Sequence, residues 1–173
     1  ACVFVPGVGG MGGAAFMALV RAGVGRFVIA DIDVFEVSNL NRQLFARADT
    51  IGQLKAEAAA RLALEINPEL QIEVLGREWT DRLPEILPRV AVAINGTDDA
   101  AAGAEYYRQC RAHGRTLIDA YASPLPSVTV VRPVKAPLWV PSIEVWLSWQ
   151  PEISRTVPAG GGMSAGRLRP NSS

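Results

Sequence analysis

The sequence contains few of the residues that build disulfide frameworks and metal centres. Among its 173 residues are two cysteines, Cys2 and Cys110, and a single histidine, His113. Two cysteines so far apart form neither a disulfide framework nor a paired C-x-x-C zinc motif, so we expect both thiols to be small buried side chains. His113 falls near the end of a predicted helix, where we expect a surface residue without a catalytic role.

Long apolar runs and an excess of charge of either sign are also missing. No apolar run approaches the roughly 20 residues of a membrane span, and no leader of the secretory type is found. The 17 basic residues balance 17 acidic ones, which predicts no bulk attraction to nucleic acid or to an anionic membrane. We therefore expect a cytoplasmic protein that binds neither, and any phosphate site in it must be local.

The composition that is present suits one soluble domain. Hydrophobic residues make up 49% of the chain and charged residues 20%, and the length allows a sizeable core. Apolar runs bounded by turn residues alternate with segments of helical period, which is typical of βαβ units around a parallel sheet. The predicted strands are 2–5, 26–30, 71–75, 90–95, 116–119 and 127–131. The predicted helices are 10–22, 51–66, 81–87 and 100–113.

The second of these helices has the clearest local pattern. Thr50 and Gln53 are predicted to form a capping box at its start, and Asn67-Pro68 ends it, because the residue before proline is pushed out of the α region. One apolar face is predicted from its period. That face consists of Leu54, Ala58, Leu62 and Ile66.

The two ends of the chain differ from the rest. Residues 1–5 already follow a strand pattern without a lead-in, so we expect a fragment of a longer protein. Periodicity fails after Pro133, and the last residues are rich in Gly, Ser and Pro. We predict a domain over residues 1–133, followed by a weakly patterned segment over residues 134–173 that ends in a partly disordered tail.

A glycine-rich segment follows the first predicted strand and opens a helix. The run Pro6-Gly7-Val8-Gly9-Gly10-Met11-Gly12-Gly13 matches G-x-G-x-x-G in the context that makes this motif informative. Glycines allow a tight turn and a close approach to a ligand, and the helix N-terminus offers free N–H groups to an anion. We predict that Gly7, Gly9, Gly10 and Gly12 bind a phosphate-bearing cofactor. A turn used only for packing is the alternative.

An acidic strand end supports the same interpretation. Asp31 lies 19 positions beyond Gly12, near the spacing of about 20 expected for an acid that binds a ribose hydroxyl. The pair Asp31 and Asp33 is therefore assigned to a nucleotide site in a Rossmann-like, doubly wound α/β fold, with helices on both faces of a mainly parallel sheet and later strands that can be antiparallel. An NAD-dependent dehydrogenase would explain these features equally well.

The segment after the second strand separates these alternatives. Asp31–Phe45, with the run Ser38-Asn39-Leu40-Asn41-Arg42-Gln43, resembles the sequence at this place in the ubiquitin-activating-enzyme-like (ThiF/MoeB/HesA) superfamily. The doubled glycine of the loop, Ile51-Gly52-Gln53-Leu54-Lys55 and Ile66-Asn67-Pro68 also resemble it. Relatives include the adenylyltransferases that activate the sulfur carriers of molybdopterin and thiamine synthesis. The similarity runs from about Val3 to Pro133.

The resemblance implies a function and assigns residues to it. The implied function is an ATP-dependent adenylyltransferase that converts a carboxylate, as at the C-terminus of a ubiquitin-like protein, a sulfur carrier or a peptide, into an acyl-adenylate. Asp31 would hold the ribose, Asn39, Arg42 and Lys55 would contact the triphosphate, and Asp98 would bind Mg²⁺. The attacking carboxylate and the phosphates of ATP are both anions and repel one another, so the reaction requires fixed cations and a metal to stabilise it. The resemblance also implies a homodimer in the full-length protein.

Asp98 is supported by the fold as well. In a doubly wound sheet the ligand lies outside the carboxyl ends of the strands, where the strand order reverses. The glycine loop follows the first strand and Asp98 follows the fourth, so both are predicted to meet at one crevice. Either Asp98 or Asp99 could instead cap the helix at 100–113, and Arg42 and Lys55 could be ordinary exposed charges.

The sequence departs from this superfamily at several places. It has neither the two C-x-x-C pairs of many relatives nor a recognisable acceptor cysteine. Asp98 is followed by Asp99 and Ala100, where relatives usually have Asn and then an Arg. A scaffold subunit without catalysis is therefore a second hypothesis, although such subunits usually lose the phosphate-binding cations. A dehydratase that adenylates a modified tRNA nucleoside is a further option within the superfamily.

Overall fold

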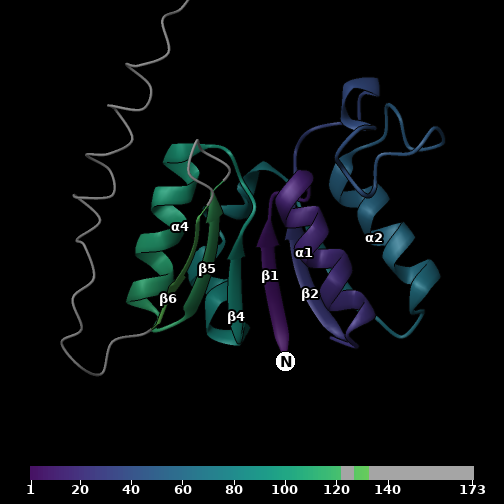
Figure 1. The fold of residues 1–173 in the computed structure, drawn as a ribbon. Helices are drawn as coiled ribbons and strands as arrows, with labels where there is room; N and C mark the ends of the chain where they lie inside the picture. Colours follow the sequence, from purple (N-terminus) through teal and green to yellow (C-terminus); the bar gives the residue numbers. More distant parts are fainter. Residues whose placement is uncertain (122–126, 133–173) are drawn as a thin grey trace, which may run out of the picture. The chain divides into compact units, whose positions relative to one another are not determined.

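The fold is built around a six-stranded sheet. The computed structural model describes residues 1–121 and 127–132, and the strand order is β3-β2-β1-β4-β5-β6 (Figure 1). The strands are β1 (Cys2–Pro6), β2 (Arg26–Ala30), β3 (Gln71–Leu75), β4 (Val92–Asn95), β5 (Thr116–Tyr121) and β6 (Ser127–Val131). The first five are parallel and β6 runs antiparallel to β5. The predicted doubly wound sheet, with a late antiparallel strand, is confirmed.

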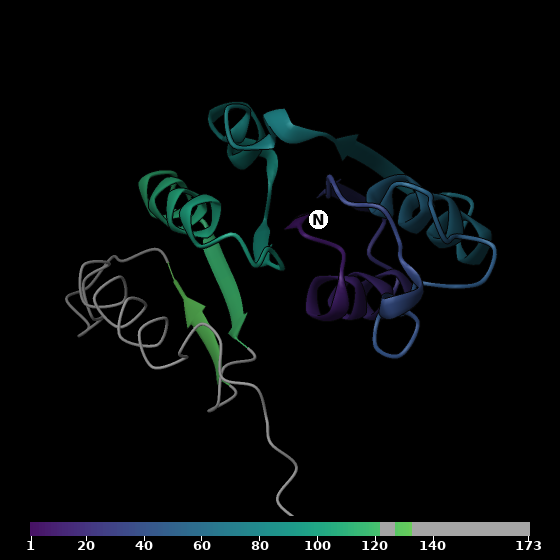
Figure 2. The ribbon, with the colours of Figure 1, turned by 90° about the horizontal axis from the view of Figure 1, so that it is seen from above.

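Helices cover both faces of this sheet, as Figure 2 shows from above. They are α1 (Gly10–Arg21), α2 (Lys55–Ile66), α3 (Leu83–Ile86) and α4 (Ala100–Ala112), with the 3-10 turns η1 (Val37–Asn39), η2 (Arg77–Trp79) and η3 (Leu87–Arg89). Alternate residues of the strands point to opposite faces. On one face Val3, Val5 and Phe27 pack with α1 and α2. On the other, Phe4 and Val28 pack with α3, α4 and the turns beside them.

The predicted start of the second helix is wrong. Helix α2 begins at Lys55, and Leu54 precedes it without any side-chain cap. The Thr50 hydroxyl donates to the Phe45 carbonyl oxygen at 2.8 Å instead of capping a helix. Gly52 has a φ of 82°, a left-handed conformation that ends any helix there. The capping box of Thr50 and Gln53 therefore does not exist, because a turn precedes the helix.

Smaller differences concern the helices α2 and α3. Leu54 and Ile66 are exposed, whereas Ala58 and Leu62 are buried. The buried face of α2 therefore differs from the predicted one, and it also includes Ala56, Ala59, Ala60 and Ala63. The predicted helix 81–87 is shorter: α3 covers Leu83–Ile86, and the 3-10 turn η3, which contains Pro88, follows it. Cys110 is buried as expected, and Cys2 is half-buried.

Two further findings concern the extent of the chain. No helix among residues 1–121 and 127–132 is long and apolar enough to cross a bilayer. The described elements all belong to residues 1–138. The predicted segment 134–173, with its tail, lies outside the described residues.

Candidate functional site

The glycine loop packs tightly against the end of β4. Gly7 has a φ of 82° and donates its N–H to the Ala30 carbonyl oxygen at 2.6 Å. A Cβ on Gly12 would collide with the Gly7 carbonyl oxygen, and a Cβ on Gly7 would collide with the Gly96 backbone. Two of the predicted glycines are thus required by the backbone contact between β1 and β4. The packing alternative accounts for Gly12, which does not line the pocket described next.

A pocket of about 280 Å³ lies at the carboxyl ends of the strands, where β1 neighbours β4 and the strand order reverses. Glycines, carboxylates, one lysine and one tryptophan meet there from the ends of β1, β2 and β4, the turn η2 and the starts of α2 and α4. Its lining residues are Gly7, Gly9, Ala30, Asp31, Ile32, Asp33, Lys55, Trp79, Thr97, Asp98, Asp99 and Ala102. The structure therefore brings Gly7, Gly9, Asp31, Asp33, Lys55 and Asp98 together, as the position of the crevice predicted.

Asp31 is held by the backbone of the loops around it. Its Oδ2 accepts from the Val8 N–H at 2.9 Å, and its Oδ1 accepts from the Asp33 N–H at 3.0 Å. Burial raises the pKa of this carboxyl, while the two backbone bonds and nearby Lys55 act in the opposite direction. The carboxylate is fixed in orientation at the end of β2, which suits it to accept bonds from hydroxyl groups.

Lys55 is the cation of this pocket. The residue is buried, with 8% of its surface exposed, and its Nζ lies 3.0 Å from Asp33 Oδ2. Its backbone N–H donates to the Asp33 carbonyl oxygen at 2.8 Å, so two bonds join the start of α2 to the end of β2. A buried ammonium that faces an exposed carboxylate is placed to receive an anionic ligand. It is not an ordinary exposed charge.

The two acids after β4 have different surroundings. Asp99 caps α4, because its Oδ1 accepts from the N–H groups of Ala101 and Ala102 at 2.9 and 3.0 Å. Asp98 has no side-chain hydrogen bond or ion pair to any residue among 1–121 and 127–132, and it lines the pocket. The capping alternative therefore applies to Asp99, and the Asp98 carboxylate is available to a ligand.

Besides Gly12, three predicted residues do not line the pocket. Gly10 begins α1 with open space around it. Asn39 is buried, and its Oδ1 accepts from the Glu36 N–H at 3.1 Å, which caps η1. Arg42 is exposed, and its Nη1 donates to the Ser38 carbonyl oxygen at 2.7 Å and to Asn41 Oδ1 at 3.2 Å. Both of the acceptors on Arg42 are neutral.

Gln43 and Trp79 were not assigned a role from the sequence. Gln43 is buried, and its Oε1 has no hydrogen-bond partner among residues 1–121 and 127–132. Its Nε2 would lie 3.6 Å from a Cβ on Gly9. The segment that carries Arg42 thus packs against the glycine loop. Gln43 belongs to the run Ser38–Gln43, and its position in that run is the signal that could have identified it as a residue of the site. Trp79 lines the pocket and packs edge-on against Phe4.

A second pocket adjoins the first at Asp31 and Ile32. Its walls are largely apolar and come from the ends of β2 and β3 and the start of α2. The lining residues are Asp31, Ile32, Leu54, Ala56, Glu57, Val74, Leu75, Gly76 and Arg77. An aromatic ring would lie beside apolar side chains here, directly next to the carboxylate of Asp31.

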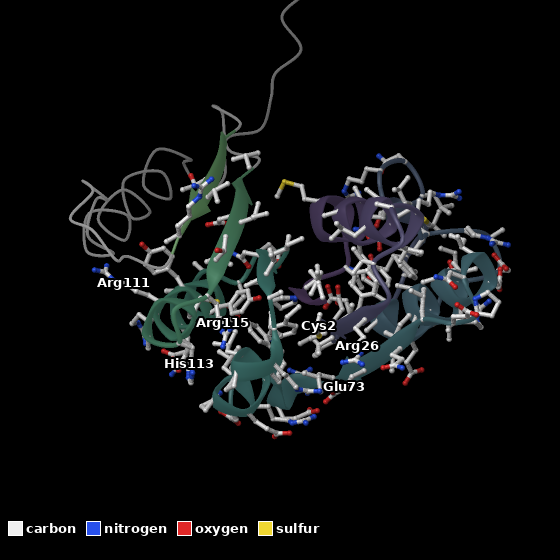
Figure 3. All side chains as sticks on the ribbon, turned by 90° about the horizontal axis from the view of Figure 1, so that it is seen from below. Cys2, Arg26, Glu73, Arg111, His113 and Arg115 are labelled. Carbon is white, nitrogen blue, oxygen red and sulfur yellow. The ribbon has the colours of Figure 1, made fainter. Side chains whose placement is uncertain are left out.

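Other charged groups lie at the opposite edge of the sheet. Figure 3, which views the molecule from below, labels Cys2 and Arg26 at the amino ends of β1 and β2, and Glu73 within β3. Glu73 accepts from Arg89 at 2.6 Å, and Cys110 is enclosed in the core. Neither thiol faces the pocket, so neither is placed as an acyl acceptor within the described residues.

Comparison with known proteins identifies the family. The model of the ThiF family matches residues 1–137. The chain belongs to the ThiF family. The sulfur carrier protein ThiS adenylyltransferase of Escherichia coli (strain K12) is 33% identical over 121 residues, which are 69% of this chain and 48% of that protein. The tRNA threonylcarbamoyladenosine dehydratase of Bacillus subtilis (strain 168) is 41% identical over 83 residues, 48% of this chain and 33% of that protein.

Solved structures of similar proteins agree with the fold. The E. coli tRNA N6-threonylcarbamoyladenosine dehydratase in complex with ATP has a TM-score of 0.66 at 30% identity, over 72% of this chain and 53% of that one. PaaA aligns over 98% of this chain and 57% of its own with a TM-score of 0.75, and at 21% identity it shows the fold alone. The chain spans about half or less of the length of these relatives.

Proposed function

We propose that this chain is the nucleotide-binding part of an ATP-dependent adenylyltransferase that activates a carboxylate. The observation that carries the proposal is the convergence of Gly7, Asp31, Lys55 and Asp98 on one pocket at the strand-order reversal. The relatives that adenylate a carrier protein or are solved with ATP support the same assignment. A dehydrogenase would leave Lys55 and Asp98 without a role, since a nicotinamide cofactor brings no triphosphate.

The two adjoining pockets match the parts of ATP. The ribose hydroxyls would bond to Asp31, which lines both pockets, and the base would lie between the apolar side chains Ile32 and Leu54. The phosphates would lie over Gly7 and Gly9, where the N-terminus of α1 favours negative charge. Asn39, Gly10 and Gly12 then support this arrangement through η1 and the loop, and the roles assigned to them as cofactor-binding residues remain predictions.

The negative charge of the pocket favours the binding of a metal cation together with ATP. Four carboxylates, Asp31, Asp33, Asp98 and Asp99, face one cation, Lys55, and a triphosphate would add further negative charge. Among the described residues no group of three or more His, Cys, Asp or Glu could hold a metal by itself. Mg²⁺ is usually bound by one or two carboxylates together with substrate phosphates. Asp98 fits such a ligand, and the ion would neutralise phosphate charge.

The chemistry requires positioning more than proton transfer. An oxygen of the attacking carboxylate forms a bond to the α-phosphorus of ATP, the bond to the bridging oxygen of the β-phosphate breaks, and pyrophosphate leaves with that electron pair. The attacking group is already ionised near neutral pH, so no general base is needed. Lys55 stabilises the charge that develops on the phosphates, in a pocket where water cannot screen it fully.

ATP–pyrophosphate exchange tests this function. The full-length protein should incorporate labelled pyrophosphate into ATP only when a protein or peptide with the correct C-terminal carboxylate is present. The candidates to supply are small carrier proteins and short peptides, with a homodimer of the full-length protein as the proposed active form. Absence of exchange with every candidate would count against this function. If the protein also failed to bind ATP, the scaffold hypothesis would be favoured. Exchange with a modified tRNA instead would favour the dehydratase option.

Arg42 is expected to bind phosphate when ATP arrives. Its present acceptors are neutral, and an anionic phosphate forms stronger bonds with a guanidinium than they do. We predict that Arg42→Ala lowers the exchange rate by about tenfold or more without a change in thermal stability. Arg47→Ala, which removes an exposed pair with Asp49, is the matched control and should leave exchange unchanged. Wild-type exchange in Arg42→Ala would remove the residue from the site.

A further inference from the structure

Asp119 is a half-buried carboxylate at the carboxyl end of β5 that does not line the proposed nucleotide pocket. It pairs across the sheet with Asn95 at the end of β4, and its Oδ1 accepts from Asn95 Nδ2 at 3.2 Å. Burial raises the pKa of its carboxyl, and the bond from Asn95 acts in the opposite direction. A partly buried acid costs stability unless it is hydrogen-bonded, so the partner of Asp119 is informative.

Asn95 uses both ends of its amide. The residue is buried, with 9% of its surface exposed, and its Oδ1 accepts from the Thr97 N–H at 3.3 Å. A Cβ on Gly103 would lie 3.3 Å from Asn95 Nδ2, so helix α4 leaves little room around the amide. Any change in the orientation of this amide must therefore break bonds at both of its ends.

The same chain of bonds continues into the pocket. Thr97 Oγ1 accepts from the Asp99 N–H at 3.2 Å, and Asp99 in turn caps α4. Four side chains thus connect the end of β5 to the start of α4. Asp98 lies between Thr97 and Asp99, so these hydrogen bonds set the position of the Gly96–Asp98 loop.

The charge of Asp119 determines which end of the Asn95 amide faces β5. An ionised carboxylate only accepts hydrogen bonds, so Asn95 must turn its NH₂ group toward β5. Its oxygen is then left for the Thr97 N–H. A neutral amide at position 119 could both donate and accept, and Asn95 would lose that constraint.

We propose that Asp119 is a positioning residue, which fixes the amide of Asn95 and thereby holds the Gly96–Asp98 loop where Asp98 meets the nucleotide-bound metal. The proposal rests on the proposed function for its last step, because the metal and the nucleotide belong to that function. It assigns Asp119 no contact with ATP, with the metal or with the acyl substrate. Its effect on them passes through Asn95 and Thr97.

An exchange of the two side chains tests this proposal. Asp119→Asn removes the charge that fixes the orientation of the Asn95 amide. Asn95→Asp places two carboxylates side by side. In the double variant Asp119→Asn/Asn95→Asp, the amide at position 119 donates to the carboxylate at position 95, which still accepts from the Thr97 N–H. The two single variants should therefore be impaired and the double variant restored, which a loss of general packing would not produce.

The first measurement needs no ligand. Hydrogen exchange of the Thr97 amide, followed by NMR on this chain, should be about tenfold faster in each single variant and within about twofold of wild type in the double variant. Asp81→Asn, a change of an exposed acid outside both pockets, is the matched control. Unchanged exchange in the single variants, or no recovery in the double variant, would overturn the proposal.

The second measurement connects the loop to the metal. The Mg²⁺ concentration for half-maximal ATP binding, from calorimetry, should rise about fivefold in each single variant and return in the double variant, while ATP binding in EDTA changes little. If wild type binds no ATP, the proposed function fails, and Thr97 exchange still decides whether Asp119 holds the loop. Should a single variant fail to fold, a folded double variant supports the coupling, and an unfolded one contradicts it.

Discussion

Lys55→Met is expected to lower ATP–pyrophosphate exchange by about 100-fold or more, because it removes the buried cation of the pocket. Methionine keeps an unbranched stem of similar length, so the packing of the Lys55 stem is retained while the charge is lost. The remaining carboxylates of the pocket would then repel the triphosphate. Binding of ATP should weaken together with the exchange rate, since Lys55 acts on the phosphates before and during the reaction.

Arg61→Met is the matched control for this change. Arg61 lies on the same helix, α2, and forms an exposed ion pair with Glu65 at 3.3 Å, a kind of pair that contributes little to stability. Thermal unfolding checks that both variants fold. If Lys55→Met kept a third or more of the exchange rate, the assignment of Lys55 to the triphosphate would be wrong.

Asp98→Asn is the second change with a large expected effect. It preserves the shape of the side chain and removes the charge that a hard cation such as Mg²⁺ requires. We predict that exchange falls by about tenfold or more at a Mg²⁺ concentration that saturates wild type, and that added Mg²⁺ recovers part of the loss. The Mg²⁺ dependence of the exchange rate is the measurement.

The neighbouring acid provides the control. Asp99→Asn keeps a good N-cap, because an amide oxygen can accept from Ala101 and Ala102 as the carboxylate does. Exchange in this variant should stay within about threefold of wild type. A larger loss in Asp99→Asn than in Asp98→Asn would transfer the metal to Asp99 and contradict the present assignment.

Much of this fold could be predicted from the sequence, because its elements carry local patterns. Strands 26–30 and 71–75 were predicted with their exact bounds, since turn residues flank both apolar runs. The start of α2 could not be predicted in the same way. The hydroxyl of Thr50 could accept from a helix N–H as a cap or donate to a carbonyl oxygen, and only the folded loop supplies the Phe45 carbonyl oxygen to which it donates.

Some features of the site could be predicted from the sequence in the same way, and others could not. The meeting of Gly7 with Asp98 follows from strand order, which the alternation of strands and helices indicates. The direction of a side chain in a loop does not follow from spacing. Arg42 and Gln43 are adjacent in the sequence, but their side chains point to different places. Arg42 turns toward the Ser38 carbonyl oxygen, and Gln43 turns toward Gly9. The link from Asp119 to Thr97 depends on the pairing of β4 with β5, which no local pattern of residues contains.

Binding of MgATP to this chain, followed through its backbone amide resonances by NMR, tests the central claim most directly. We predict that MgATP shifts the amides of Gly7, Gly9 and Thr97 first and most strongly, and that NADH at the same concentration does not. If MgATP shifted only amides outside the pocket between β1 and β4, or if NADH produced the larger shifts there, the nucleotide site proposed here would be contradicted.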